Sequence, residues 1–285
     1  MARGLGLLRS KGKTGIALAL ILTLSACAAA RERNRELTLE ELGPEVIFQR
    51  AEAELEAGQP DDAAALFIEV ERLYPYSEWA QRSLIMATFA YHTDRDYENS
   101  RASAQRYLDF YPGTEDAAYA QYLLALSYYD QIDQVGRDQG LTFQALQALR
   151  VVIERYPDSE YAASAILKFD LAFDHLAGKE MEIGRYYLRR QNYTAAINRF
   201  RVVVEQFQTT SQTPEALLRL VESYLALGLP NEAQTAGAIL GYNFQGSPFY
   251  DDAFRILNNQ DLAPEAAGES WLREIWQQTV RGEWL

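Results

Sequence analysis

Few side chains in this sequence have the types and spacing that catalysis or metal binding requires. The two histidines, His92 and His175, lie far apart in the chain, and the acidic pairs Asp61-Asp62 and Asp251-Asp252 fall where helices are expected to start. Carboxylates at helix starts stabilise the helix dipole, so these pairs are interpreted as helix caps. No phosphate loop, nucleophile elbow or zinc-binding helix motif is present. We therefore predict no catalytic residue, no metal site and no cofactor, and a protein that is not an enzyme.

The only cysteine, Cys27, has a sequence context that predicts chemistry. It follows a basic leader and a short apolar run, residues 15–24, which has the length of a signal-peptide core and is too short to span a bilayer. The sequence Leu24-Ser25-Ala26-Cys27 resembles a bacterial lipobox, which predicts removal of residues 1–26 and acylation of the cysteine. Acyl chains anchor a protein to a membrane, and Ala28 after the cysteine favours the outer membrane, at its periplasmic face. The alternative is a signal anchor in which the cysteine is incidental.

The net charge limits the kinds of partner. The chain has 27 basic and 40 acidic side chains, a net charge of −13, and loss of residues 1–26 removes four basic and no acidic side chains, which leaves −17. Nucleic-acid binding requires clustered Lys and Arg, so no nucleic-acid partner is expected. An acylated cysteine leaves no thiol for a disulfide or a thiolate metal site. Residues 27–43 are polar and charged, and are predicted to tether the fold to the lipid, its only contact with the membrane.

The elements after this tether are predicted to be helices arranged in repeats. From residue 44 to about 257, apolar residues recur every three or four positions, and no stretch alternates as a strand does. An aromatic residue followed by Pro or Gln recurs at spacings of 37, 45, 51 and 37 residues. A period near about 34 residues, with small residues and tyrosines upstream, is typical of the tetratricopeptide repeat, a helix–turn–helix unit. The recurring aromatic positions are Tyr74, Tyr111, Tyr156, Phe207 and Phe244.

We therefore predict an all-α fold, a tetratricopeptide-repeat solenoid over residues 44–257 with about five repeats and about ten helices. One helical hairpin cannot bury its own apolar face, whereas stacked hairpins share a continuous core. A polar loop at 131–140 and an added helix at about 159–177 would account for the two wider spacings. A linker and a short amphipathic helix are expected within residues 258–285.

The recurring motif also predicts where helices end and begin. Proline cannot continue a helix, so the Pro after the aromatic residue is expected to end the second helix of a repeat. Ser77, Thr114 and Ser159 each follow the Pro by two residues and are predicted to be N-caps of the next helix.

The first helix of each tetratricopeptide repeat lines a concave groove, and in the first three repeats the groove positions are mainly aromatic, with one arginine. Exposed aromatic grooves are typical of interaction sites, so we predict a peptide-binding groove. Two alternatives remain open: the N-terminal end packs on itself, or the helix at 159–177 covers the rings. The predicted groove residues are Phe48, Arg82, Ile85, Phe89, Tyr119, Tyr122 and Tyr129.

Several local sequences are together similar to one known family. They are the lipobox, YPYS in the second repeat, the inserted VGRDQ, the helix start RYPDSEYA and the run IGRYYLRRQNYTAAINRF. On these motifs, from Cys27 to about residue 257, the chain resembles the BamD family, the tetratricopeptide-repeat lipoproteins of the outer-membrane β-barrel assembly machinery. The last 28 residues lie outside this pattern.

The resemblance implies a non-catalytic scaffold that helps to insert and fold outer-membrane proteins. Its implied partners are the periplasmic domains of the barrel-forming subunit, the other lipoproteins of the complex, and unfolded outer-membrane proteins. It also implies that Asn198 and Arg199 contact the barrel-forming subunit. The predicted groove would then bind the C-terminal end of an unfolded barrel protein, with Arg82 pairing with the terminal carboxylate.

Two other classes of protein are alternatives to this one. The first is a different periplasmic tetratricopeptide adaptor lipoprotein, which would serve pilus or cell-wall assembly. The second is an enzyme such as a lytic transglycosylase, in which a helical solenoid carries a catalytic domain. Only 28 residues follow the repeats, which is too few for such a domain.

Overall fold

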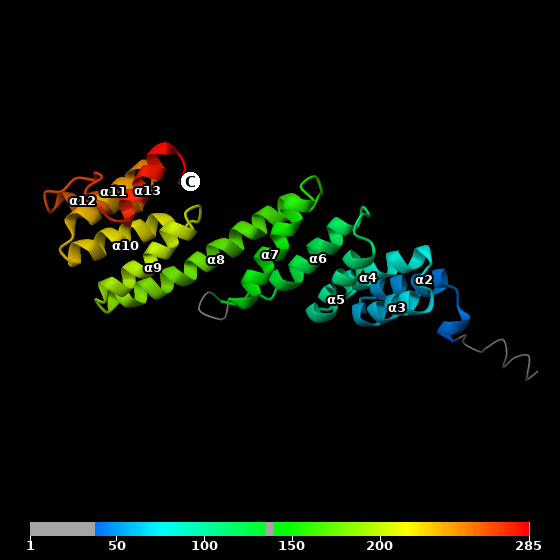
Figure 1. Ribbon diagram of the computed structural model, residues 1–285. Coiled ribbons are helices and arrows are strands. Elements are labelled where there is room, and N and C mark those ends of the chain that lie inside the picture. The colour runs from blue at the N-terminus through cyan, green and yellow to red at the C-terminus, as the bar shows by residue number, and fades with distance from the viewer. Residues whose placement is uncertain (1–37, 135–138, 285) are drawn as a thin grey trace, which may run out of the picture.

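The computed structural model describes residues 38–134 and 139–284, and its regular elements are all helical (Figure 1). Within these residues the chain forms one 3-10 helix, twelve α-helices and no strand, which confirms the predicted all-α fold. Cys27, the signal peptide and most of the tether lie outside the described residues, as does most of the VGRDQ sequence. The helices are η1 (Leu39–Glu41), α2 (Pro44–Glu56), α3 (Pro60–Leu73), α4 (Glu78–Thr93), α5 (Tyr97–Phe110), α6 (Ala117–Tyr129), α7 (Gly140–Arg155), α8 (Ala162–Arg189), α9 (Tyr193–Gln206), α10 (Thr213–Ala226), α11 (Pro230–Asn243), α12 (Pro248–Asn258) and α13 (Trp271–Arg281).

Consecutive helices pair as hairpins that stack in a row. The five hairpins are α2 with α3, α4 with α5, α6 with α7, α8 with α9, and α10 with α11. The first helices of neighbouring repeats also touch, α2 with α4 and α4 with α6. Each hairpin buries its apolar face against the next, and the result is the elongated row that runs from blue to red in Figure 1. The predicted solenoid of five helix–turn–helix repeats is thus the observed architecture.

The aromatic and hydroxyl residues that recur in the sequence form a turn between hairpins. At four places a Ser or Thr hydroxyl donates a hydrogen bond to the backbone carbonyl oxygen of the aromatic residue three positions earlier. These bonds are Ser77 to Tyr74 (2.8 Å), Thr114 to Tyr111 (3.0 Å), Ser159 to Tyr156 (2.8 Å) and Thr210 to Phe207 (2.7 Å).

Only one of the three predicted N-caps has this role. The Ser77 hydroxyl also accepts a hydrogen bond from the backbone N–H of Ala80, at 3.2 Å, in the first turn of α4. The prediction is wrong for Thr114 and Ser159, because the helices that follow them, α6 and α8, begin three residues later. Their hydroxyls close the turn without capping a helix.

Helix α8 also differs from the prediction. The expected separate helix at 159–177 and the first helix of the fourth repeat are one uninterrupted helix of 28 residues. Its first half packs on α7 through Ala165, and its second half packs on α9 through Ala177 and Met181. No proline occurs between its ends, and a glycine in a helix costs only about 1 kcal/mol. Burial of both halves therefore outweighs the weak helix preference of Gly178 and Gly184.

The α8–α9 contact is close because small residues lie in it. Ala196 and the Phe200 ring on α9 are fully buried. Gly184 on α8 lies directly against that ring: a Cβ added at Gly184 would stand within 2.8 Å of three of its carbons. Position 184 therefore requires glycine because a larger side chain would overlap the Phe200 ring, although the helical backbone at this position is compatible with other residues.

The C-terminal segment folds back on the last repeats. Helix α13 packs on α11, and its Leu272 and Ile275 are buried in the same core as the fourth and fifth repeats. The Trp271 indole N–H donates to the Tyr224 hydroxyl at 2.9 Å, and that of the buried Trp284 donates to the Val204 carbonyl at 3.3 Å. The amphipathic helix predicted in this region thus covers the end of the solenoid.

Candidate partner-binding surfaces

Arg82 is held above two aromatic rings at the surface of the first two repeats. Helix α4 places Trp79 and Arg82 one turn apart, and α2 contributes Phe48. The guanidinium carbon lies 5.2 Å from the centroid of the Phe48 ring and 5.0 Å from that of Trp79. Arg82 is exposed and has no ion pair within the described part of the chain. Its cation–π contacts hold the group in place while its N–H donors remain available to an anion.

The other predicted groove residues near Arg82 are less accessible. Phe48 is 2 % exposed and Ile85 is buried, so both belong to the core beneath the surface. Phe89 is half-buried. Trp79 is the residue at this site that the sequence interpretation missed. Its position one helical turn before Arg82 is the signal that could have identified it.

The tyrosines of the third repeat are partly covered by the start of α8. Tyr161 stacks on Tyr119, with ring centroids 5.1 Å apart, and on Tyr122, with centroids 5.2 Å apart. The Tyr122 and Ser164 hydroxyls share a hydrogen bond of 2.7 Å. Burial raises the pKa of Tyr161 to about 12, with a smaller effect from the neighbouring Glu160 carboxylate. For these two rings, the structure corresponds to the alternative in which the segment at 159–177 covers them.

Tyr129 has a similar neighbour, since the Lys168 ammonium of α8 lies 5.6 Å from the centroid of its ring. The seven predicted groove residues are therefore not one open groove. Arg82 and three of the others, Phe48, Ile85 and Phe89, lie in the first two repeats, and the three tyrosines lie beside α8. Among these positions, only Arg82 is a cation without an ion pair to another described residue. We call the surface that it forms on α4 with Trp79 and Phe89 the Arg82 surface.

Asn198 and Arg199 lie on α9, at the other half of the molecule. Asn198 is exposed. The Arg199 Nη1 forms an ion pair of 3.0 Å with Glu180 Oε2 of α8, and 43 % of the arginine side chain remains exposed. A partly exposed pair of this kind contributes little to stability. It does orient the guanidinium, whose other donors are free to meet a partner.

A ladder of alternating charges on α8 and α10 was not predicted. Arg185 donates to the Glu215 carboxylate through two nitrogens, and Arg219 donates to Glu215 at 3.2 Å and to Glu222 at 2.9 Å. The hydrogen bonds from Arg185, followed by its charge, hold the pKa of Glu215 below its usual range although burial opposes this. The acidic residues occur at positions 215 and 222 and the arginine at 219, a spacing that puts them on one helical face.

Two further features of the described residues concern metal-binding side chains and membrane-spanning helices. In the described ranges 38–134 and 139–284, no three His, Cys, Asp or Glu side chains are grouped as a metal site requires. His92 is instead close to Asp130, with His92 Nε2 and Asp130 Oδ2 3.1 Å apart. None of the helices in those ranges is both long enough and apolar enough to cross a membrane.

Comparison with known proteins identifies relatives over most of the chain. The profile of the YfiO family, described as outer membrane lipoprotein, matches residues 40–239. The outer membrane protein assembly factor BamD of Caulobacter vibrioides is 49 % identical over 228 residues, which cover 80 % of this chain and 75 % of that protein. The factor of the same name from Rickettsia prowazekii is 42 % identical over 69 % of this chain and 78 % of that protein. That of Neisseria meningitidis serogroup A is 30 % identical over 74 % of this chain and 83 % of that protein. The chain therefore belongs to the YfiO family of outer membrane lipoproteins, and it is similar to these three BamD assembly factors over 69–80 % of its own length.

Proposed function

We propose that this chain is a non-catalytic scaffold that assists the assembly of outer-membrane proteins at the periplasmic face of the outer membrane. The observation that supports this most directly is the match to the YfiO family together with 49 % identity to an outer membrane protein assembly factor. A solenoid of stacked repeats fits this role, because it presents long surfaces to several partners at once. In this proposal residues 1–26 are the signal peptide, residues 27–43 are the lipidated tether, and Cys27 is the anchor.

Co-purification tests this function against the adaptor alternative. The full-length protein is recovered from detergent-solubilised membranes, and the proteins that accompany it are identified by mass spectrometry. A β-barrel protein with periplasmic domains, together with other lipoproteins, is the expected result. Recovery of pilus or cell-wall assembly proteins in place of a barrel protein would instead support the other class of periplasmic adaptor.

Asn198 and Arg199 are the proposed contact with the barrel-forming subunit. Arg199 is already oriented by Glu180 and has exposed donors, which suits a charge-assisted contact to a carboxylate of the partner. Arg199→Ala is expected to reduce recovery of the barrel subunit, with a loss of affinity of about 30-fold if the residue is a hot spot. Arg72→Ala is the matched control, because Arg72 also forms a surface ion pair, with Glu69, at the opposite end of the solenoid. Equal recovery by the two variants, with an unchanged helical signal, would remove Arg199 from the interface.

The Arg82 surface is the proposed site for the C-terminal end of an unfolded barrel protein. Such an end has a terminal aromatic side chain and a carboxylate, and the surface offers an unpaired guanidinium over Trp79, with Phe89 two turns further along α4. The carboxylate would form a charge-assisted hydrogen bond with Arg82, and aromatic contact adds about 0.5–1.5 kcal/mol per pair. Binding is therefore expected to be weak, as release of a substrate requires.

A thermodynamic cycle tests the contact between the carboxylate and Arg82. A peptide ending in Phe and its C-terminal amide are titrated against the wild-type protein, Arg82→Ala and the control Arg50→Ala, which removes an exposed arginine of the first repeat. Amidation and Arg82→Ala should each weaken binding, and together no more than either alone, because they remove the two ends of one contact. Additive losses would show that Arg82 does not contact the carboxylate, and absence of binding by both peptides would dismiss the site.

A further inference from the structure

The wide spacing before the fourth repeat corresponds to half a repeat. The aromatic positions Tyr156 and Phe207 are 51 residues apart, against 37 for Tyr74 and Tyr111, so 14 residues are added. This is the length of one helix of this solenoid, such as α9 or α10, and α8 with 28 residues is twice as long. The extra 14 residues therefore supply one additional helix, which has no second helix to pair with it among the described residues.

The position of α8 identifies which helix has no counterpart. Its first half packs on α7 and touches α6, as the first helix of a repeat does, and its second half already pairs with α9. In a complete repeat a second helix would run back along the first half and cover it. Here that face is open, and its Phe169 and Phe173 side chains are only half-buried.

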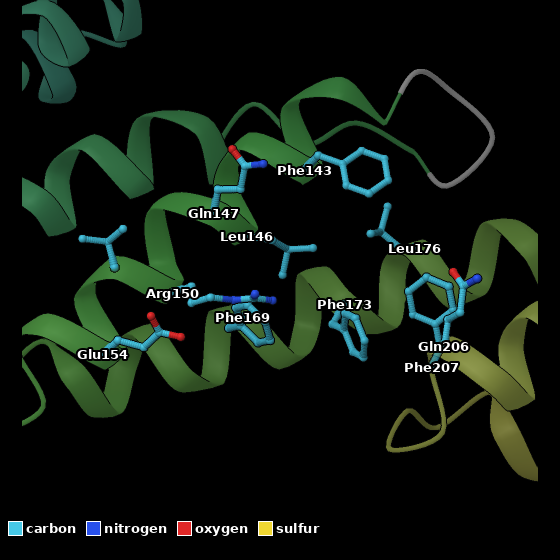
Figure 2. A pocket seen from close by; sticks show the side chains of 11 residues that line it. Phe143, Leu146, Gln147, Arg150, Glu154, Phe169, Phe173, Leu176, Gln206 and Phe207 are labelled. Carbon is cyan, nitrogen blue, oxygen red and sulfur yellow. The ribbon is translucent and has the colours of Figure 1, made fainter.

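A hollow of about 420 Å³ lies where the second helix would be (Figure 2). Helix α7 forms one side with Phe143, and the first half of α8 forms the floor with Phe169 and Phe173. The other side is the end of α9, where the Phe207 ring lies 4.9 Å from that of Phe173. Aromatic side chains thus line a trough between two second helices of the solenoid, α7 and α9.

We propose that an amphipathic α-helix of a partner protein docks in this trough, in the place of the missing second helix. The repeat architecture indicates a helix as the occupant. In each of the five hairpins, the first helix is covered by a second helix. The partner would bury an apolar face on Phe143, Phe169 and Phe173, in the helix-in-groove mode of recognition.

The charges at the rim indicate the polar pattern of that helix. Arg150 and Glu154 lie one turn apart on α7 and both line the trough. Arg150 lies 5.5 Å from the centroid of the Phe169 ring, and neither side chain forms an ion pair in the part of the chain that the structure describes. A second helix runs antiparallel to α8 and therefore in the same direction as α7. A carboxylate of the partner opposite Arg150, followed four residues later by Lys or Arg opposite Glu154, would complement both charges, and this order also stabilises the partner helix itself.

Binding of designed helices tests this pattern. Two stapled peptides of about four turns share one apolar face and one composition, and differ only in Glu-x-x-x-Lys against Lys-x-x-x-Glu. Fluorescence anisotropy with the full-length protein in detergent should show roughly fivefold tighter binding of the first peptide. The double variant Arg150→Glu, Glu154→Arg should reverse this order. Equal affinities, or an order that does not reverse, would overturn the proposed orientation and with it the proposal.

A pair of phenylalanine variants tests the location. Phe143→Ser removes a side chain that is 55 % exposed in the trough, and Phe110→Ser removes one that is 66 % exposed on α5. Both positions are at the surface, so neither change should disturb folding. Phe143→Ser is expected to weaken the first peptide about tenfold, and Phe110→Ser to leave it unchanged. The same effect of both variants would place the peptide elsewhere.

Cross-linking in cells tests the natural occupant. A photoreactive benzophenone residue replaces Val151, at the rim of the trough, and the linked segment is mapped by mass spectrometry. The expected adduct is a helix of another protein with an acidic residue four positions before a basic one. An adduct within this chain, with a second copy of it, or with a segment lacking that pattern would overturn the proposal, as would no adduct. The outcome does not depend on Arg199, whose substitution is scored separately by recovery of the barrel subunit.

Discussion

Replacement of Gly184 by alanine measures how closely α8 and α9 approach. An alanine in place of glycine normally stabilises a helix interior by about 0.5–1 kcal/mol. At Gly184 the added methyl group would lie within 2.8 Å of three carbons of the buried Phe200 ring. Overpacking of this kind costs about 1–3 kcal/mol. The balance of the two ranges predicts a decrease in the free energy of unfolding, centred on about 1 kcal/mol and reaching about 2.5 kcal/mol, opposite in sign to the usual effect.

The assay is urea unfolding followed by far-ultraviolet circular dichroism, with Gly113→Ala as the control. A Cβ at Gly113 meets no atom within 4 Å, and glycine-to-alanine changes at unstrained positions stabilise by about 0.4–1 kcal/mol. Phe200→Leu provides the second test, because a smaller side chain should relieve the clash, and the cost of Gly184→Ala should then shrink in the double variant. Stabilisation by Gly184→Ala, or an unchanged cost beside Phe200→Leu, would refute the close packing deduced for these helices.

Four further predictions address the anchor, the core, the charges and the C-terminus. Cys27→Ala should abolish partitioning into the detergent phase, and continued partitioning would contradict lipid anchoring. Ala196→Leu, at a fully buried site, should lower the free energy of unfolding by about 1–3 kcal/mol, and an unchanged thermal midpoint would argue against the assigned register. Because Arg185 lowers the pKa of Glu215, this carboxylate stabilises the fold above the ordinary carboxyl pKa and loses that effect as pH falls through the lowered pKa. Glu215→Gln should therefore flatten the loss of stability in acid, and an unaltered pH profile would contradict the shift. Trp284→Ala removes a buried ring, which typically costs about 3–5 kcal/mol, and should increase hydrogen exchange in α13; unchanged exchange would show that the segment is held without it.

The all-α class, the five hairpins and the amphipathic helix near the C-terminus could be predicted from the sequence. Each of these follows from signals within a few turns of chain: apolar residues at helical spacing, a proline after an aromatic residue, and a repeat period. Local signals of this kind depend on which residues are near in sequence, so they can be recognised without a tertiary structure.

Other features depended on contacts between distant residues. The sequence indicated extra length before the fourth repeat, but burial on both α7 and α9 made α8 one helix with an open face. Thr114 and Ser159 are of the residue types that cap helices. In the structure, however, their hydroxyls donate hydrogen bonds to the backbone carbonyl oxygens of Tyr111 and Tyr156 within the turn.

The partners of the candidate binding residues were likewise decided by tertiary structure. The sequence placed an arginine among aromatic residues and another after Asn198, and packing determined that Arg82 lies over Trp79 and Phe48 while Arg199 pairs with Glu180. Packing of the start of α8 on α6 also placed the Tyr161 ring against two of the predicted groove rings. The physical reason is that helix periodicity specifies which face a residue occupies, whereas the side chain opposite it is set by how neighbouring helices pack.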